Sequence, residues 1–136
     1  MSIDLSKLKP IELPTREVEI QIKDDFTVNE AGEKTPNIQK VVVHAISGEG
    51  MLAWRNNNLN DPKSVEFEAR ACITALVYGA DIPEEKARLL LNYDRETANK
   101  LNVAVWMLTA EFYSAKKAEA ETAEKNSEAA EVSSGD

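Results

Sequence analysis

The chain has 136 residues, of which 43% are hydrophobic, and this length fits one domain with a core of its own. Its formal net charge of −8 argues against binding to nucleic acids or to anionic membrane surfaces, because both need clustered Lys and Arg. No run of about 20 apolar residues could span a membrane, no apolar block marks a signal peptide, and the single cysteine, Cys72, excludes an intrachain disulfide, so we expect a soluble cytoplasmic protein.

The N-terminal third of the chain predicts an irregular arm followed by a β-hairpin. Residues 1–15 contain Pro10 and Pro14 among scattered apolar residues, which is typical of an irregular segment. From Arg16, apolar and polar residues alternate with the period of a half-buried strand. The turn formers of residues 29–37 predict a hairpin loop, and the β-branched run over residues 39–46 predicts an antiparallel second strand.

Three short helices are predicted after the hairpin. Ser47 offers an N-cap to the first of them. Asp61 followed by Pro62 predicts the start of the second, which Gly79 ends, and Pro83 opens the third. The predicted apolar face of the second helix consists of Val65, Ala69, Cys72, Ile73, Leu76 and Val77.

Asp94 is the predicted N-cap of a long final helix, which carries more apolar surface than a small core needs. One apolar stripe recurs at steps of three and four residues and consists of Ala98, Leu101, Val105, Leu108, Phe112 and Ala115. A second stripe beside it consists of Val103, Trp106, Met107, Ala110 and Tyr113. Because a surface helix is normally apolar over only about 100°, we interpret the excess as a surface shared with a partner.

After Ala115 the composition becomes acidic and almost free of large apolar residues. Ala, Glu and Lys favour continued helix, but without apolar surface to bury we expect the end to be disordered. The predicted organisation is an irregular arm over 1–15, a single α+β domain over 16–115, and a flexible acidic tail over 116–136. The predicted fold class is α+β, with an N-terminal β-hairpin and a mostly helical C-terminal two-thirds.

The sequence offers few residues for catalysis. His44 is the only histidine, and we expect it to face solvent or to make a local hydrogen bond. A nucleophile pair of Cys72 and His44 is the one formal alternative, but Cys72 lies on an apolar helix face and is predicted to be a buried core residue. One Cys and one His make a dedicated zinc site improbable, and no phosphate-binding glycine loop is present. We therefore predict a protein that is not an enzyme and has no metal or cofactor.

The two apolar stripes of the final helix allow two interpretations. The first stripe equally fits a domain core, whereas Trp, Tyr and Met of the second stripe are typical of protein interfaces. We predict that six residues bind a partner: Leu101, Val105, Trp106, Leu108, Phe112 and Tyr113. Trp54 is a weaker candidate. An apolar groove walled by acidic residues would suit apolar helices with basic flanks.

This layout resembles the tail assembly chaperones of long-tailed bacteriophages. The resemblance covers residues 38–120, including a turn at Ile46-Ser47-Gly48-Glu49 and a last helix that runs from Leu101-Asn102 through alternating aliphatic residues to Phe112-Tyr113. It is a likeness of arrangement, without an invariant motif.

The resemblance implies a protein that coats the apolar, helical tape measure protein and keeps it soluble before the tail tube polymerises. It further implies self-association, here predicted through the last helix, and a longer frameshifted form whose extension recruits the tail tube protein. Such a protein acts in the host cytoplasm and is absent from the mature virion. Two other classes are left open: a structural head–tail or tail-completion protein of the virion, and a small acidic regulatory protein that binds a basic partner.

Overall fold

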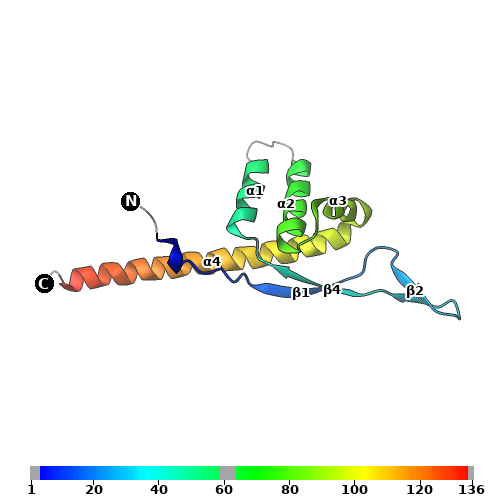
Figure 1. Ribbon diagram of the computed structural model, residues 1–136, viewed down its shortest axis with the longest axis horizontal. Helices are drawn as coiled ribbons and strands as arrows, with labels where there is room; N and C mark the ends of the chain where they lie inside the picture. The colour runs from blue at the N-terminus through cyan, green and yellow to red at the C-terminus, as the bar shows by residue number, and fades with distance from the viewer. Residues whose placement is uncertain (1–3, 59–63, 135–136) are drawn as a thin grey trace.

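The protein is a mixed α+β molecule, as the sequence predicts. In the computed structural model, the backbone is described for residues 4–58 and 64–134, and side chains for 4–56 and 68–122. The elements in chain order are η1 (Leu5–Lys7), β1 (Thr15–Ile20), β2 (Phe26–Val28), β3 (Lys34–Pro36), β4 (Gln39–His44), α1 (Gly48–Asn58), α2 (Ser64–Gly79), α3 (Glu84–Tyr93) and α4 (Arg95–Ser134). Figure 1 shows an elongated arrangement, in which α4 is the longest element and α1 to α3 gather on one side of it. The predicted helix start at Asp61 and Pro62 lies outside the described residues.

Strands β1 and β4 form the predicted antiparallel ribbon, with Thr15 opposite His44 and Ile20 opposite Gln39. The alternation of the sequence gives the ribbon two different faces. Val18, Ile20 and Val43 are buried on one face, whereas Val42 on the other face is exposed. The ribbon is therefore half-buried, as the period-two pattern indicates.

The hairpin is longer than the sequence predicts, because residues 34–36 of the expected loop form a strand. β3 pairs with β2 in a second ladder, from Phe26 opposite Pro36 to Val28 opposite Lys34. Between the two ladders, residues 21–25 on one side face only residues 37–38 on the other. Asp25 holds this irregular junction together, since its carboxylate accepts a hydrogen bond of 2.9 Å from Asn37 Nδ2. The turn itself is confined to residues 29–33, where Gly32 adopts a φ of +80° that favours glycine.

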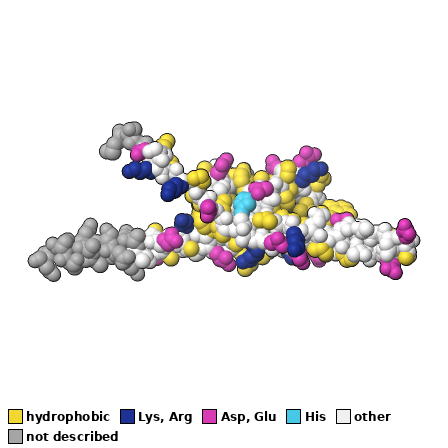
Figure 2. Space-filling model, turned by 60° about the horizontal axis from the view of Figure 1, so that its bottom comes forward, with side chains coloured by type: hydrophobic (Ala, Val, Ile, Leu, Met, Phe, Trp, Pro, Cys, Tyr) yellow, Lys and Arg dark blue, Asp and Glu magenta, His cyan; other side chains and the backbone are white. Residues whose placement is uncertain are grey.

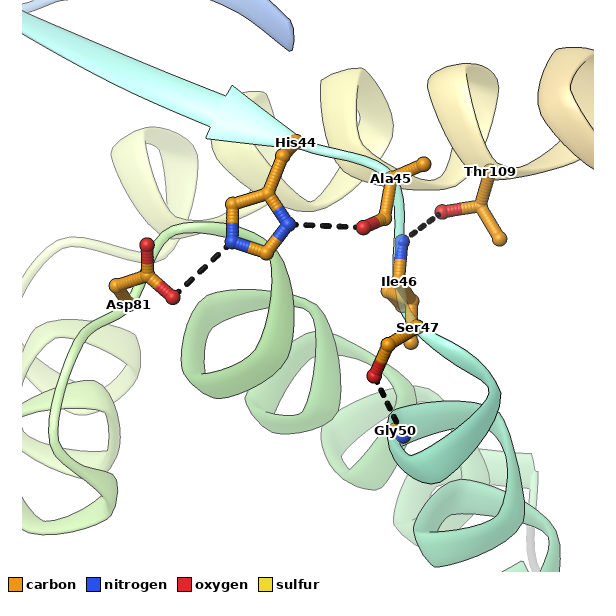
Figure 3. Close-up of polar contacts among 7 residues, drawn as sticks. All are labelled: His44, Ala45, Ile46, Ser47, Gly50, Asp81 and Thr109. Atoms are coloured by element: carbon orange, nitrogen blue, oxygen red, sulfur yellow. Dashed lines mark hydrogen bonds and ion pairs between the residues drawn. The ribbon is translucent and has the colours of Figure 1, made fainter. Parts of the chain in front are cut away.

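The connection from β4 to α1 is tied to α4 by hydrogen bonds (Figure 3). The Ser47 hydroxyl accepts a bond of 3.2 Å from the Gly50 amide, which confirms the predicted N-cap. The Ile46 amide donates to Thr109 Oγ1 at 2.9 Å, and the Tyr113 hydroxyl donates to the Ile46 carbonyl at 3.0 Å. These bonds satisfy buried backbone groups where the ribbon meets the helices.

The core forms where α4 packs between the ribbon and the shorter helices. Helices α2 and α3 pack on α4, α1 packs on α2, and β1 and β4 contact α4 as well. The largest fully buried side chains are those of Ile46, Leu76, Leu101, Val43 and Val105. They come from the ribbon exit, α2 and α4, so all three layers contribute to one core.

Asp94 joins the beginning of α4 to the hairpin. Its carboxylate accepts a bond of 3.1 Å from the Thr97 amide, which confirms the predicted N-cap, and a bond of 2.6 Å from the Lys23 amide. The Thr97 hydroxyl lies 2.6 Å from the same carboxylate and 3.1 Å from the Gln21 carbonyl. The hydrogen bond from the Thr97 side chain is the largest of the effects that lower the pKa of Asp94, and it outweighs the opposing effect of burial.

Helix α4 continues to Ser134, so the helix that Ala, Glu and Lys favour beyond Ala115 extends into the predicted tail. Residues 116–122 are all exposed. Figure 1 shows the C-terminal half of α4 extending beyond the other helices, and we call it the projecting half of α4. The high helix propensity of Ala, Glu and Lys accounts for a helix that buries little surface. Within residues 4–58 and 64–134, no helix combines the length and apolar character needed to cross a membrane.

Gly79 provides a direct test of the packing between α2 and α4. A methyl group on Gly79 would lie 2.3 Å from Val105 Cγ1, whereas one on Gly48 would meet nothing within 4 Å. We expect Gly79→Ala to lower the free energy of unfolding by about 1–3 kcal/mol through overpacking. Gly48→Ala should leave it unchanged or raise it by up to about 1 kcal/mol. Urea unfolding measures both; equal effects of the two substitutions would contradict the close approach.

Candidate partner-binding site

The inner face of α4 belongs to the core, which corrects part of the predicted partner-binding set. Leu101 and Val105 are fully buried, and Leu108 is 5% exposed. The ribbon and α2 cover this stripe within the same chain, so these three side chains offer nothing to a partner. The alternative interpretation of the first stripe, as domain core, is the correct one.

Trp106 is half-buried and wedged against neighbouring helices. Its indole Nε1 donates to the Ala71 carbonyl of α2 at 3.2 Å. Its ring meets the ring of Trp54 edge to face, with centroids 5.2 Å apart and planes at 61°. Trp54, the weaker candidate, therefore supports Trp106 from α1, and only part of the Trp106 ring is open to solvent.

Phe112 and Tyr113 lie further along α4 and are also partly engaged. The Phe112 ring packs against the core and contacts the Tyr113 ring at 5.1 Å between centroids. Tyr113 is 36% exposed, and its hydroxyl donates a hydrogen bond to the Ile46 carbonyl. Both aromatic side chains have more of a structural role than the sequence indicates.

An apolar surface that stays open on α4 is its outer stripe, which we define as Val103, Met107 and Ala110. Val103 is 47% exposed and Met107 is 50% exposed, and Ala110 is exposed as well. The spacing of four and three residues places the three side chains on one face of the helix. The sequence placed all three in the second stripe, but it ranked the aromatic residues of that stripe above them.

A groove of about 750 Å³ lies between α2, α3 and α4. Its apolar lining comes from Ala71 and Cys72 of α2, Leu91 of α3 and Trp106 of α4. Exposed polar groups, including Glu68, Glu96 and Asn99, complete the lining. Val103 follows Asn99 by four residues and precedes Trp106 by three, so the outer stripe borders this groove.

Of the six predicted partner-binding residues, Trp106 alone lines the groove. The contributions of Ala71, Leu91 and Asn99 cannot be read from the sequence, because no single periodic pattern contains residues of three helices. Only the fold-back of α3 against α2 and α4 brings them together.

Cys72 and His44 do not form a pair. The Cys72 thiol is buried and lies 3.7 Å from the Ala98 carbonyl, and burial raises its pKa to about 11, against a smaller lowering by Arg95. The ring of His44 lies elsewhere, with Nδ1 2.8 Å from the Ala45 carbonyl and Nε2 3.0 Å from Asp81 Oδ1 (Figure 3). Cys72 is therefore a neutral core thiol at pH 7, and both nitrogens of His44 have acceptors.

Among the residues that the structure describes, no group of three or more His, Cys, Asp or Glu could hold a metal ion. Comparisons with protein-family models, with curated protein sequences and with solved structures find no significant match. The features of this chain that bear on function are the groove and the exposed apolar surfaces.

The interaction between His44 at the end of β4 and Asp81 before α3 can be measured through the titration of His44. Burial lowers its pKa, but the bond to Asp81, the bond to the Ala45 carbonyl and the charge of Asp81 outweigh burial and raise it above the ordinary value. The imidazolium thus stabilises the fold at pH values below about 6.5, and this stabilisation is lost as pH rises through the raised pKa. Asp81→Asn keeps a side chain that tolerates the φ of 53° at this position but removes the charge.

We expect Asp81→Asn to lower the His44 pKa and to destabilise the protein more at pH 5.5 than at pH 8.5. Because His44 is the only histidine, its imidazole proton signals can be followed by NMR without ambiguity, and urea unfolding at the two pH values measures stability. An unchanged His44 pKa in the variant would show that the ion pair is absent in solution.

Proposed function

We propose that the protein binds apolar helical segments of a partner and acts as a phage tail assembly chaperone for the tape measure protein. The observation that carries the proposal is the groove, whose apolar lining includes Leu91 and Trp106 and whose edge continues into the exposed outer stripe. The groove supports a binding role; the identity of the partner rests on the family resemblance.

The chemistry of the groove suits an amphipathic helix with basic flanks. Such helices insert apolar side chains at spacings of three and four residues into a groove and keep their polar face in solvent. The exposed carboxylates of Glu68 and Glu96 would face basic residues beside the apolar anchors. Arg95 contributes one opposing charge, within a chain whose net charge is −8.

The proposed mechanism is passive protection. Each contact removes apolar surface of the partner from water, at about 25 cal/mol per Å², and so offsets its tendency to aggregate. Met107 in the outer stripe suits varied partner side chains, because its thioether chain is flexible. Like-charge repulsion between acidic complexes would keep them dispersed in the host cytoplasm until the tail tube forms.

The same proposal gives the projecting half of α4 a role. A longer, frameshifted product would carry its extension beyond this exposed helix, away from the groove, where it could recruit the tail tube protein. The chaperone would then leave the assembly and be absent from the virion.

The groove can be blocked from α2 by substituting Ala69, which is half-buried in its lining. Ala69→Arg would fill the groove and repel basic flanks, so co-purification with the proposed tape measure protein should fall at least tenfold. Ala118→Arg adds the same side chain at an exposed position of α4 outside the groove and should have no effect. Thermal melting verifies that both variants fold.

If Ala69→Arg does not fold, Asn99→Arg tests the same groove from an exposed position on α4. Binding should persist in high salt, because apolar burial is not screened, whereas an acidic regulatory protein would lose a basic partner. Undiminished capture of the partner by folded groove variants would overturn the proposal.

A further inference from the structure

The distal hairpin, which we define as residues 24–38, carries exposed apolar residues on an acidic support. Phe26 is 40% exposed, Val28 58% and Ile38 57%. All residues of β2 and β3 are exposed, and Figure 1 shows the hairpin projecting beyond the helices. A two-stranded hairpin of this size is marginal in isolation, and its apolar surface is unused within the chain.

The distal hairpin is also strongly acidic. It contains four carboxylates (Asp24, Asp25, Glu30 and Glu33) and one ammonium group, Lys34. The Nζ atom of Lys34 lies over the Phe26 ring, 5.8 Å from the ring centre. One positive charge therefore stands against four negative charges in the distal hairpin. The tip therefore combines apolar side chains with a negative surface.

The N-terminal arm, residues 4–12, carries exposed apolar residues beside two lysines. Leu5, Leu8 and Ile11 are 65–71% exposed, and they recur every three residues in a segment that is extended apart from the single turn η1. Lys7 and Lys9 lie on either side of Leu8. Of the two carboxylates in the arm, Asp4 accepts hydrogen bonds from Ser6, and Glu12 lies close to the anchored end at Pro14.

Helices α1 to α3 lie between these two segments along the long axis of the molecule (Figure 1). Figure 2 shows Lys and Arg side chains on the N-terminal arm and Asp and Glu side chains at the far tip of the hairpin. The separation prevents the arm from reaching the hairpin of its own chain. A second copy has no such restriction.

We propose that the N-terminal arm of one copy binds the distal hairpin of another. Leu5, Leu8 and Ile11 would cover Phe26 and Val28, while Lys7 and Lys9 face Glu30 and Glu33. The contact is head-to-tail, so it leaves one free arm and one free hairpin at the ends and can add further copies. It does not depend on the groove, and it differs from association through the last helix.

The small size of the contact determines its strength. An arm of nine residues buries less than the roughly 1,200 Å² of a stable interface, so association should be reversible and concentration-dependent. Sedimentation should therefore show the 15.1 kDa monomer at low concentration and increasing mass at high concentration. A wild-type chain that remains monomeric throughout would overturn the proposal.

Three variants separate this contact from other surfaces. Leu5→Ser with Leu8→Ser, and Phe26→Ser with Val28→Ser, should each weaken association by at least tenfold. Val103→Ser with Met107→Ser changes the outer stripe and should leave association unchanged; loss of association in that variant instead would contradict an arm-to-hairpin contact. All six positions are exposed, and circular dichroism verifies the fold.

Mixing provides the sharpest test. The arm variant keeps its hairpin and the hairpin variant keeps its arm, so an equimolar mixture should form a capped heterodimer and nothing larger. A charge exchange tests the ion pairs in the same way: Lys7→Glu with Lys9→Glu, and Glu30→Lys with Glu33→Lys, should each fail alone and associate when mixed. Mixtures that remain monomeric would show that the two ends do not bind each other.

Discussion

Burial of the inner face of α4 is the constraint on which the rest of the molecule depends. Leu101 and Val105 are fully buried because the ribbon and α2 cover them, and Gly79 allows α2 to approach Val105 closely. The ribbon alone would be a marginal two-stranded sheet. Helices α2 and α3 bury their apolar residues Cys72, Ala75, Leu76 and Ala87 in the same core as α4. The long helix thus supplies the surface against which the other layers become stable.

This use of α4 decides which apolar residues stay available. Trp106 and Tyr113 have polar atoms that find backbone acceptors inside the fold, at Ala71 and Ile46, so the chain itself occupies much of each side chain. Val103 and Met107 have no hydrogen-bond donor in their side chains, and they lie on the side of the helix away from the core. On this side of α4, the open apolar surface therefore includes the outer stripe and the groove that it borders.

The polar contacts around the ribbon explain how such an elongated molecule holds its hairpin in place. Asp94 binds the Lys23 amide, His44 faces Asp81, and Thr109 accepts the Ile46 amide. Each contact joins the ribbon or its exit to a helix or turn distant in sequence. The distal hairpin and the N-terminal arm lie beyond these ties, which leaves their apolar residues open to solvent.

The sequence by itself determined the elements that depend on local physics: the alternation of the ribbon strands, the caps at Ser47 and Asp94, and the two apolar stripes of α4. It underestimated the hairpin, because Lys34–Pro36 becomes a strand only by pairing with β2. Which stripe becomes core depends on where the ribbon and α2 dock. Only the tertiary structure decided that choice. It also decided that Leu91 and Trp106 line one groove, because contacts between distant segments produce no periodic pattern in the sequence.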